Sequence, residues 1–427
     1  MMTFTKSALL GTAAVLTAAA GAQAADLPSR KAAPVAYVKI CDVYGRGFYY
    51  VPGTNTCLKV GGRVRFEFGW RRAQNVSTNG TTLTNAANSM DTLGWRSRAY
   101  VNMDARTQTA WGTVQTVLSI SLRSRSGIFN GGGNGAQGNT TASPQVYAAY
   151  IRFAGFTFGR AQYVFSNGPG YIWYITNWSG GSAIGTMQLA YTAVLGGGMS
   201  ATIALEDKSE FATQVPTAPN RKPNIVLTLR ADQGWGFVRA SAAYGWTNNA
   251  AATFEKSGWA VGADAKINMP SIARGDALYL RAAYGDGLVD YVTGGNWANG
   301  SKAKDGRITG GYQPSIANFY GNSSVKAWSA MVAFTHFWSP TVRSNVAWSY
   351  LNIDNPASAG DYYGSTSWQA SHQLVWSPTS GFNIGLEVYY AKINHSVSAT
   401  RAAALAAIGV KRNPDDLAVK LRVERTF

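Results

Sequence analysis

The chain has 427 residues and a formal charge of +17, because 38 Lys and Arg residues outnumber 21 Asp and Glu residues. Its hydrophobic fraction of 46% and aromatic fraction of 12% exclude an intrinsically disordered protein. Charged residues make up only 14% of the chain, against about 25% in soluble globular proteins. No apolar run after the first two dozen residues could form a membrane-spanning helix. The remaining class is a β protein rich in glycine and aromatic residues.

Residues 1–24 have the pattern of a secretory signal peptide. Lys6 precedes an apolar run over residues 8–20, and Ala22-Gln23-Ala24 is a cleavage sequence of the small-x-small type. The expected cleavage lies between Ala24 and Ala25. The apolar run is too short to cross a bilayer, so we expect the protein to be exported.

Residues 25–57 are expected to form a periplasmic amino-terminal segment that contains both cysteines, Cys41 and Cys57. An exported protein can join such a pair in a disulfide, and two cysteines without a nearby histidine do not make a zinc site. Residues 45–53 read as turn, strand, turn. We therefore predict a small hairpin closed by a disulfide that contributes roughly 3 kcal/mol; two free thiols are the alternative.

Residues 58–427 repeat an alternation of apolar and polar side chains typical of β-strands. Near the start, one parity is apolar and the other charged: Val60, Val64, Phe66, Phe68 and Trp70 against Lys59, Arg63, Arg65 and Glu67. The carboxyl end repeats the pattern: Leu417, Val419, Leu421, Val423 and Phe427 against Lys420, Arg422, Glu424 and Thr426. Each such segment has one apolar and one polar face.

The connections between these segments alternate in length. Short turns such as residues 154–155 and 196–198 separate eight long polar stretches, at residues 71–91, 125–143, 166–186, 207–222, 247–257, 286–325, 353–365 and 393–414. Long loops on one rim and short turns on the other are typical of outer-membrane barrels. We predict an all-β fold, a transmembrane antiparallel β-barrel of about sixteen strands over residues 58–427, with short periplasmic turns, long extracellular loops and an aqueous interior.

Alternation alone also permits a soluble β-sandwich, such as a surface adhesin, whose charged face would point outward. The export signal, the loop asymmetry, the low charge and the aromatic excess favour the barrel, because Trp and Tyr suit membrane interfaces. The basic charge does not indicate a nucleic acid partner, since the protein is exported and the charge is placed inside. Phe427 ends an alternating strand, as in barrels delivered to the barrel-assembly machinery.

Several segments resemble the porins of alphaproteobacteria, of the rhizobial and brucella type. The resemblance is carried by residues 41–45 (CDVYG), 57–65 (CLKVGGRVR), 149–160 (AYIRFAGFTFGR) and 425–427 (RTF), and it covers essentially the whole chain. It implies an outer-membrane barrel of sixteen strands, a homotrimer, passive diffusion of small hydrophilic solutes, and a third long loop folded into the pore. We expect contacts with outer-membrane lipid and lipopolysaccharide, and no cofactor or metal.

The chemistry of such a channel lies in the charge pattern of its wall. We predict a basic ladder that lines the pore and gives a weak preference for anions: Arg63, Arg65, Arg96, Arg98, Arg106, Arg123 and Arg160. Glu67 and Asp104 are the expected acidic residues of this wall. The alternative is that these side chains are ordinary solvated residues of the lumen or rim.

The third loop should form the constriction, yet no charged residue lies between Ala161 and Leu205. It offers an aromatic and neutral surface instead: Tyr171, Trp173, Tyr174, Asn177 and Trp178. These side chains could pack the loop against the wall or form a path for sugars. A substrate-specific channel for a sugar or an anion is therefore the second candidate function.

We expect no enzymatic activity. His336 and His372 share the parity of apolar neighbours, as interface residues would. Ser371 adjoins His372, but neighbours in a strand point to opposite faces, which argues against a serine–histidine catalytic pair.

Overall fold

The computed structural model describes residues 39–72, 92–129, 140–165, 185–207, 222–248, 255–293 and 318–427. The chain divides after Ile40 into two units, and the second contains every strand described below. The expected signal peptide, its cleavage site and the five residues proposed for the constriction loop lie outside the described ranges.

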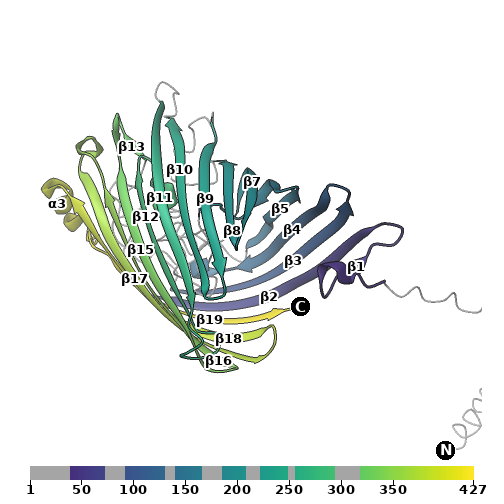
Figure 1. The fold of residues 1–427 in the computed structure, drawn as a ribbon. Helices are drawn as coiled ribbons and strands as arrows, with labels where there is room; N and C mark the ends of the chain where they lie inside the picture. Colours follow the sequence, from purple (N-terminus) through teal and green to yellow (C-terminus); the bar gives the residue numbers. More distant parts are fainter. Residues whose placement is uncertain are drawn as a thin grey trace, which may run out of the picture. The chain divides into compact units, whose positions relative to one another are not determined.

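Seventeen strands share one sheet (Figure 1). They are β1 (Tyr49–Tyr50), β2 (Thr56–Arg71), β3 (Leu93–Thr109), β4 (Gly112–Arg125), β5 (Thr140–Phe153), β6 (Phe156–Ala161), β7 (Thr186–Gly196), β8 (Met199–Glu206), β9 (Asn224–Gln233), β10 (Gly236–Asn248), β11 (Glu255–Asn268), β12 (Ala277–Asp286), β15 (Lys326–Ser339), β16 (Val342–Asp354), β17 (Tyr362–Thr379), β18 (Phe382–Val397) and β19 (Asp415–Thr426).

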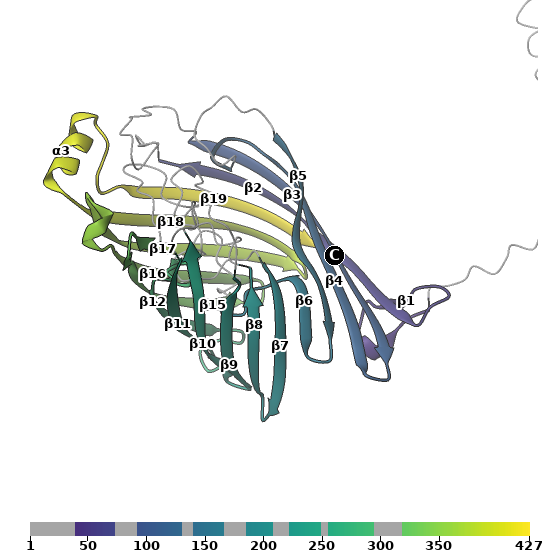
Figure 2. The same ribbon diagram turned by 90° about the horizontal axis from the view of Figure 1, so that it is seen from above.

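The sheet closes into a barrel because its last strand pairs with an early one. β19 lies antiparallel to β2, from Ala418 opposite Arg71 to Thr426 opposite Arg63. Every other neighbouring pair is also antiparallel, and β1 is an added short strand on β2, so sixteen strands form the ring (Figure 2). The predicted fold class and strand number are confirmed.

Helices are few and short in the described chain. They are η1 (Asp42–Tyr44), η2 (Gly127–Phe129), α2 (Asp290–Thr293), η4 (Ala357–Ala359) and α3 (Ala399–Ala407), and a two-stranded ribbon, β13 (Phe319–Tyr320) and β14 (Ser323–Ser324), lies between β12 and β15. Among the described residues, no helix combines the length and the apolar character needed to cross a bilayer.

Short turns join alternate strand pairs, and the predicted alternation of connection lengths is present. β5 and β6 are joined by Ala154 and Gly155, whose φ angles are 51° and 86°. Two central residues with positive φ suit a two-residue hairpin, whose twist then matches that of the strands. The strand ends at which the long connections begin consequently lie at the opposite rim.

Burial in the barrel is inverted relative to a soluble protein. Trp95 and Leu229 are 54% and 61% exposed, whereas Glu67 and Lys420 are fully buried. A soluble sandwich would bury the apolar set and expose the charged set. The apolar side chains therefore face lipid and the charged ones face the interior, as in a membrane barrel.

Candidate pore wall and constriction

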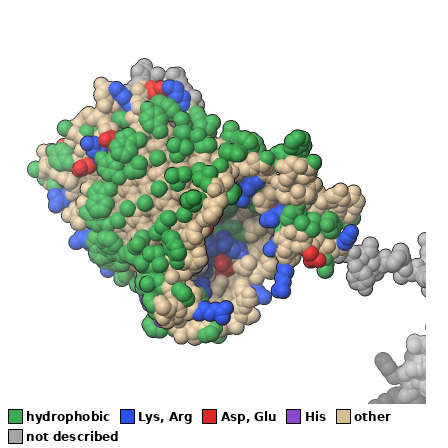
Figure 3. All heavy atoms as spheres, in the orientation of Figure 1, with side chains coloured by type: hydrophobic (Ala, Val, Ile, Leu, Met, Phe, Trp, Pro, Cys, Tyr) green, Lys and Arg blue, Asp and Glu red, His purple; other side chains and the backbone are tan. Residues whose placement is uncertain are grey.

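One wall of the barrel interior is basic, and it comprises β19, β2, β3 and β4. The register places two rows of charged residues across these strands. The first row is Glu424, Arg65, Arg98 and Arg123, and the second is Arg422, Glu67, Arg96 and Arg125. Six arginines and two glutamates thus lie opposite one another. Figure 3 shows basic side chains gathered around an acidic one inside a hollow.

Glu67 is the centre of the second row. Its carboxylate lies 2.5 Å from Arg96 Nε and 2.6 Å from Arg422 Nη2, and Lys420 Nζ is 4.0 Å away. All four side chains are nearly or fully enclosed. Glu67 therefore neutralises part of the basic wall from within it and does not form an exposed acidic patch.

A segment after β4 covers this row from the lumen side. The Phe129 ring lies 4.4 Å from the Arg96 guanidinium carbon, a distance suited to a cation–π contact. A Cβ at Gly69 would come within 2.9 Å of the Phe129 ring, and one at Gly94 within 2.8 Å of Ile128. The two glycines therefore leave room for η2 against the wall.

The first row is more open. Arg65 Nε lies 2.6 Å from Glu424, and the partly exposed Arg63 lies 3.9 Å from the same carboxylate. Arg98 donates a hydrogen bond of 3.1 Å to the Tyr100 hydroxyl. The Arg63 guanidinium carbon lies 4.0 Å from the centre of the Tyr100 ring. The row thus combines several guanidinium groups with a tyrosine.

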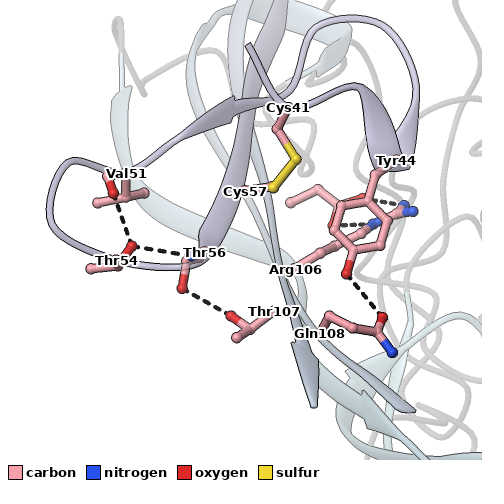
Figure 4. Close-up of a disulfide and its surroundings, with 10 residues drawn as sticks. Cys41, Tyr44, Val51, Thr54, Thr56, Cys57, Arg106, Thr107 and Gln108 are labelled. Carbon is pink, nitrogen blue, oxygen red and sulfur yellow. Dashed lines mark hydrogen bonds and ion pairs between the residues drawn. A yellow bond between two sulfur atoms is a disulfide. The ribbon is translucent and has the colours of Figure 1, made fainter. Parts of the chain in front are cut away.

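The predicted disulfide is present and closes a hairpin beside the short-turn end of β3 (Figure 4). The Arg106 guanidinium carbon lies 5.5 Å from the Tyr44 ring centre and 4.9 Å from that of Phe48. Asp104 accepts two hydrogen bonds from Arg106, of 3.0 and 2.7 Å. Such a bidentate pair of a guanidinium with a carboxylate is stronger than a pair of neutral groups. Arg106 and Asp104 therefore hold the hairpin and lie apart from the two rows.

The opposite part of the wall is less basic. Arg239 of β10 lies 3.0 Å from Asp264 of β11, and Arg281 of β12 lies 3.5 Å from the same carboxylate. All three side chains are buried. This wall contributes less net positive charge than the two rows do.

The third long connection begins inside the barrel. After β6, residues 162–165 cross the inner faces of successive strands: Gln188 of β7, Glu206 of β8, Thr228 of β9 and Ser241 of β10 bond in turn to Gln162, Val164, Val164 and Phe165. The Phe165 ring continues to β11, where a Cβ at Gly262 would lie 3.0 Å from it. These contacts direct the chain inward at the point where the third loop starts.

A second connection also enters the lumen. Residues 288–293, which follow β12 and include α2, are almost completely buried. Tyr291 packs on Phe165 with ring centres 4.9 Å apart, and its hydroxyl donates to Glu206 Oε2 at 2.8 Å. Since Glu206 also accepts from the backbone N–H of Val164 at 3.0 Å, one carboxylate joins both segments. We call these three residues, Glu206, Tyr291 and Val164, the latch.

Burial shifts the pKa of two groups within residues 288–293. Removal from water raises the pKa of Asp290 to about 7, although Asn318 donates a hydrogen bond of 2.8 Å to its carboxylate. Removal from water also raises the pKa of Tyr291 well above its ordinary value. Asp290 is therefore partly protonated near neutral pH.

The structure brings together five of the residues proposed for the ladder. Arg65, Arg96, Arg98 and Arg123 lie on β2, β3 and β4 within the two rows, and Arg63 lies beside the first row on β2. Arg160 lies on β6 opposite the exposed Met187 and shares the parity of the exposed Phe156 and Phe158, so the register places it on the outer face, outside the two rows. The predicted site residues did not include Arg422, Glu424, Lys420 or Arg125, although the sequence shows the polar parity of β19.

His336 and His372 bond to neighbouring polar groups. His336 Nδ1 lies 2.7 Å from Asp276 Oδ2, and His372 Nε2 lies 3.2 Å from Ser344 Oγ. Ser371 instead donates to Glu387 on the inner face. Among the described residues no cluster of His, Cys, Asp or Glu could hold a metal ion.

Comparison with known proteins agrees with this architecture. The family model described as "Porin subfamily" matches residues 26–416. The chain is 29% identical to Porin Omp2a of Brucella melitensis over 382 residues, covering 80% of this chain and 96% of that protein. It is 30% identical to Porin Omp2b of Brucella canis over 358 residues, covering 81% and 89%.

Solved structures share the fold. The outer membrane channel DcaP of Acinetobacter baumannii superposes with a TM-score of 0.65 at 16% identity, covering 88% of this chain and 99% of that one. An anion-selective porin from Comamonas acidovorans gives a TM-score of 0.50 at 10% identity, covering 87% and 100%. The closed barrel, its inward-facing charges and the family match together show that the chain belongs to the porin family of the bacterial outer membrane.

Proposed function

We propose that this porin is a general diffusion channel with a mild preference for small anions. The observation that carries the proposal is the excess of guanidinium groups over carboxylates in the two rows. A water-filled pore lined by fixed positive charge concentrates anions and repels cations. The Comamonas acidovorans porin, a barrel of the same fold, is anion-selective, which supports the same preference here.

The test is the reversal potential of the purified protein in a planar bilayer that separates two KCl concentrations. We expect large stepwise conductance and a reversal potential whose sign indicates a preference for chloride. A potential of the cation-selective sign would overturn the anion preference while leaving the channel itself established.

A substrate-specific channel is the second candidate function. The lumen is narrowed by the buried residues 288–293 and by the third connection, which starts inward. A narrower lumen favours a substrate-specific channel. Swelling of liposomes in sugars of increasing size separates the two. A general channel gives rates that fall smoothly with solute size, whereas a specific channel admits one sugar far faster than others of equal size.

We also propose a homotrimer without catalytic activity, as membership of the porin family supports. Chemical cross-linking in detergent should trap a species of three subunits. Contact with lipopolysaccharide is supported by a basic cluster on the outer wall at the long-loop rim, where Arg72 and Lys411 lie 2.5 and 3.6 Å from Asp415. Such cations could meet lipid phosphates.

We propose that the barrel-assembly machinery recognises Phe427. Its backbone exchanges two hydrogen bonds with Gly62, and a Cβ at Gly62 would lie 2.9 Å from the Phe427 ring. The ring is nevertheless 73% exposed. An assembly assay with Phe427→Ala should show slower folding in membranes and little change in a barrel refolded in detergent.

A further inference from the structure

We propose that Tyr291 is a positioning residue that sets the size limit of the pore, because it joins residues 288–293 to the start of the third connection. The proposal rests on the proposed function, since a size limit has meaning only in an open diffusion channel. It deepens that function by assigning the limit to one hydroxyl group and its two hydrogen bonds.

The inner wall is shaped to receive residues 288–293. Gly245 of β10 lies directly opposite Gly258 of β11. A Cβ at Gly245 would lie 3.1 Å from the Leu288 side chain, and one at Gly258 would collide with the backbone of Gly287. Glycine within a strand often marks a place where another backbone approaches closely. A second pair of facing glycines admits η2 on the basic wall in the same way. The segment is therefore a built-in part of the lumen.

The segment lies across the lumen from the basic rows. In the ring of sixteen strands, β10, β11 and β12 stand opposite β2, β3 and β4. The Val292 carbonyl accepts a hydrogen bond of 3.1 Å from Ser329 of β15, and the backbone N–H of Val289 donates to Asn318 at 2.9 Å. Residues 288–293 therefore take up lumen space on the side opposite the two rows, and their displacement would widen the path.

One carboxyl group links this segment to the third connection. Glu206 Oε2 accepts from the Tyr291 hydroxyl at 2.8 Å, and Oε1 accepts from the backbone N–H of Val164 at 3.0 Å. The Glu206 side chain is fully buried, and no cationic side chain of the described chain lies within ion-pair distance of it. Burying a carboxyl group without a cation costs free energy. We infer that its position serves the two segments that it joins.

The Tyr291 ring and hydroxyl contribute separately to this link. The ring packs on Phe165 of the third connection, with ring centres 4.9 Å apart. The hydroxyl donates to Glu206 and accepts a hydrogen bond of 3.3 Å from Asn224 of β9. Replacement by Phe would therefore keep the ring contact and remove both hydrogen bonds.

The test compares wild type with Tyr291→Phe in proteoliposomes, by the rate of swelling in glucose and in the larger sugars sucrose and raffinose. We expect the rates for the larger sugars, relative to glucose, to rise in the variant, because the two segments are no longer held together. Hydrogen exchange should become at least about tenfold faster over residues 288–293 and also over residues 162–165, a change that corresponds to about 1.4 kcal/mol.

The matched control is Tyr150→Phe. This tyrosine lies on β5, a strand that carries neither the latch nor residues 288–293, and its ring centre is 4.7 Å from the Arg152 guanidinium carbon. The control should keep the wild-type size dependence and exchange rates. Heat-dependent gel mobility verifies that each variant is folded.

Wild-type relative rates in Tyr291→Phe would overturn the proposal, and so would faster exchange that is confined to residues 288–293. Wild-type proteoliposomes that do not swell in glucose would overturn the diffusion channel itself, and the size limit with it. The two failures are therefore distinguished by the wild-type rate in glucose.

Discussion

At the scale of single residues, Glu67 is a fully buried carboxylate whose charge depends on its ion-pair partners. It is enclosed on the inner wall between two arginines and one lysine. Removing one partner of a buried ion network leaves the others uncompensated, which typically costs several kcal/mol. The carboxylate is therefore needed for folding more than for contact with solutes.

We expect Glu67→Gln to destabilise the barrel by on the order of 3 kcal/mol. The measurement is unfolding by guanidinium chloride, followed by the change in gel mobility between folded and unfolded chains. Glu424→Gln is the control, because its side chain keeps 15% exposure beside the lumen and its ion pair should contribute about 1 kcal/mol or less. Equal losses in the two variants would contradict the role given to Glu67.

At the scale of elements, two structures outside the ring of strands are held by different devices. The amino-terminal hairpin is joined to β2 by the disulfide and packs on Arg106. The segment after β12 is held by the latch and by Asp290 with Asn318. The two devices should respond to different conditions, one to reduction and one to pH.

Replacing Cys41 and Cys57 together by Ser should loosen the hairpin and leave the barrel folded. The disulfide contributes roughly 3 kcal/mol by constraining the unfolded chain. Hydrogen exchange should therefore become faster over residues 41–57, and wild type treated with dithiothreitol should behave like the variant. Unchanged exchange in both samples would show that the contacts with Arg106 suffice to hold the hairpin.

The segment that contains Asp290 should be less firmly held at high pH. Its pKa is raised to about 7 in the folded chain, above the ordinary value of about 3.9. A raised pKa contributes stability that is complete below about pH 4 and is lost as the pH rises through about 7. Hydrogen-exchange protection of residues 288–293, corrected for intrinsic rates, should fall at least about tenfold from pH 5 to pH 8.5.

Asp290→Asn is the matched variant for this pH effect, because it keeps the size of the side chain and cannot ionise. It should make the protection of residues 288–293 nearly independent of pH. If the variant keeps the wild-type pH dependence, another group, such as the Glu206 carboxylate of the latch, controls the segment.

At the scale of the whole molecule, charge is separated by face. The outer wall exposes apolar residues such as Trp95 and Leu229 to lipid, and the inner wall holds the charged rows. Within the lumen, positive charge concentrates on β19 and β2–β4, while on β10–β12 Asp264 offsets part of the charge of Arg239 and Arg281. This asymmetry gives the pore a one-sided positive wall.

Much of this arrangement could be predicted from the sequence, because the period of two in a strand is a local property. This period placed Arg63, Arg65, Arg96 and Arg98 on one face. The export signal and the turn–strand–turn pattern between Cys41 and Cys57 predicted their disulfide. Register across distant strands is not local. The pair of Glu67 with Arg422 joins residues 355 positions apart, and Glu206 meets Tyr291 over 85 positions. Such contacts required the closed barrel to be known.

The most direct test of the central claim is the reversal potential in a KCl gradient of a variant in which Arg63, Arg65, Arg98 and Arg123 are all Gln. These changes lower the positive charge of the wall and leave Glu67 with Arg96 and Arg422. We predict that the potential shifts toward cation selectivity relative to wild type, while the channel still opens in large steps. An unchanged potential in a folded, conducting variant would contradict the claim that this wall sets the ion preference.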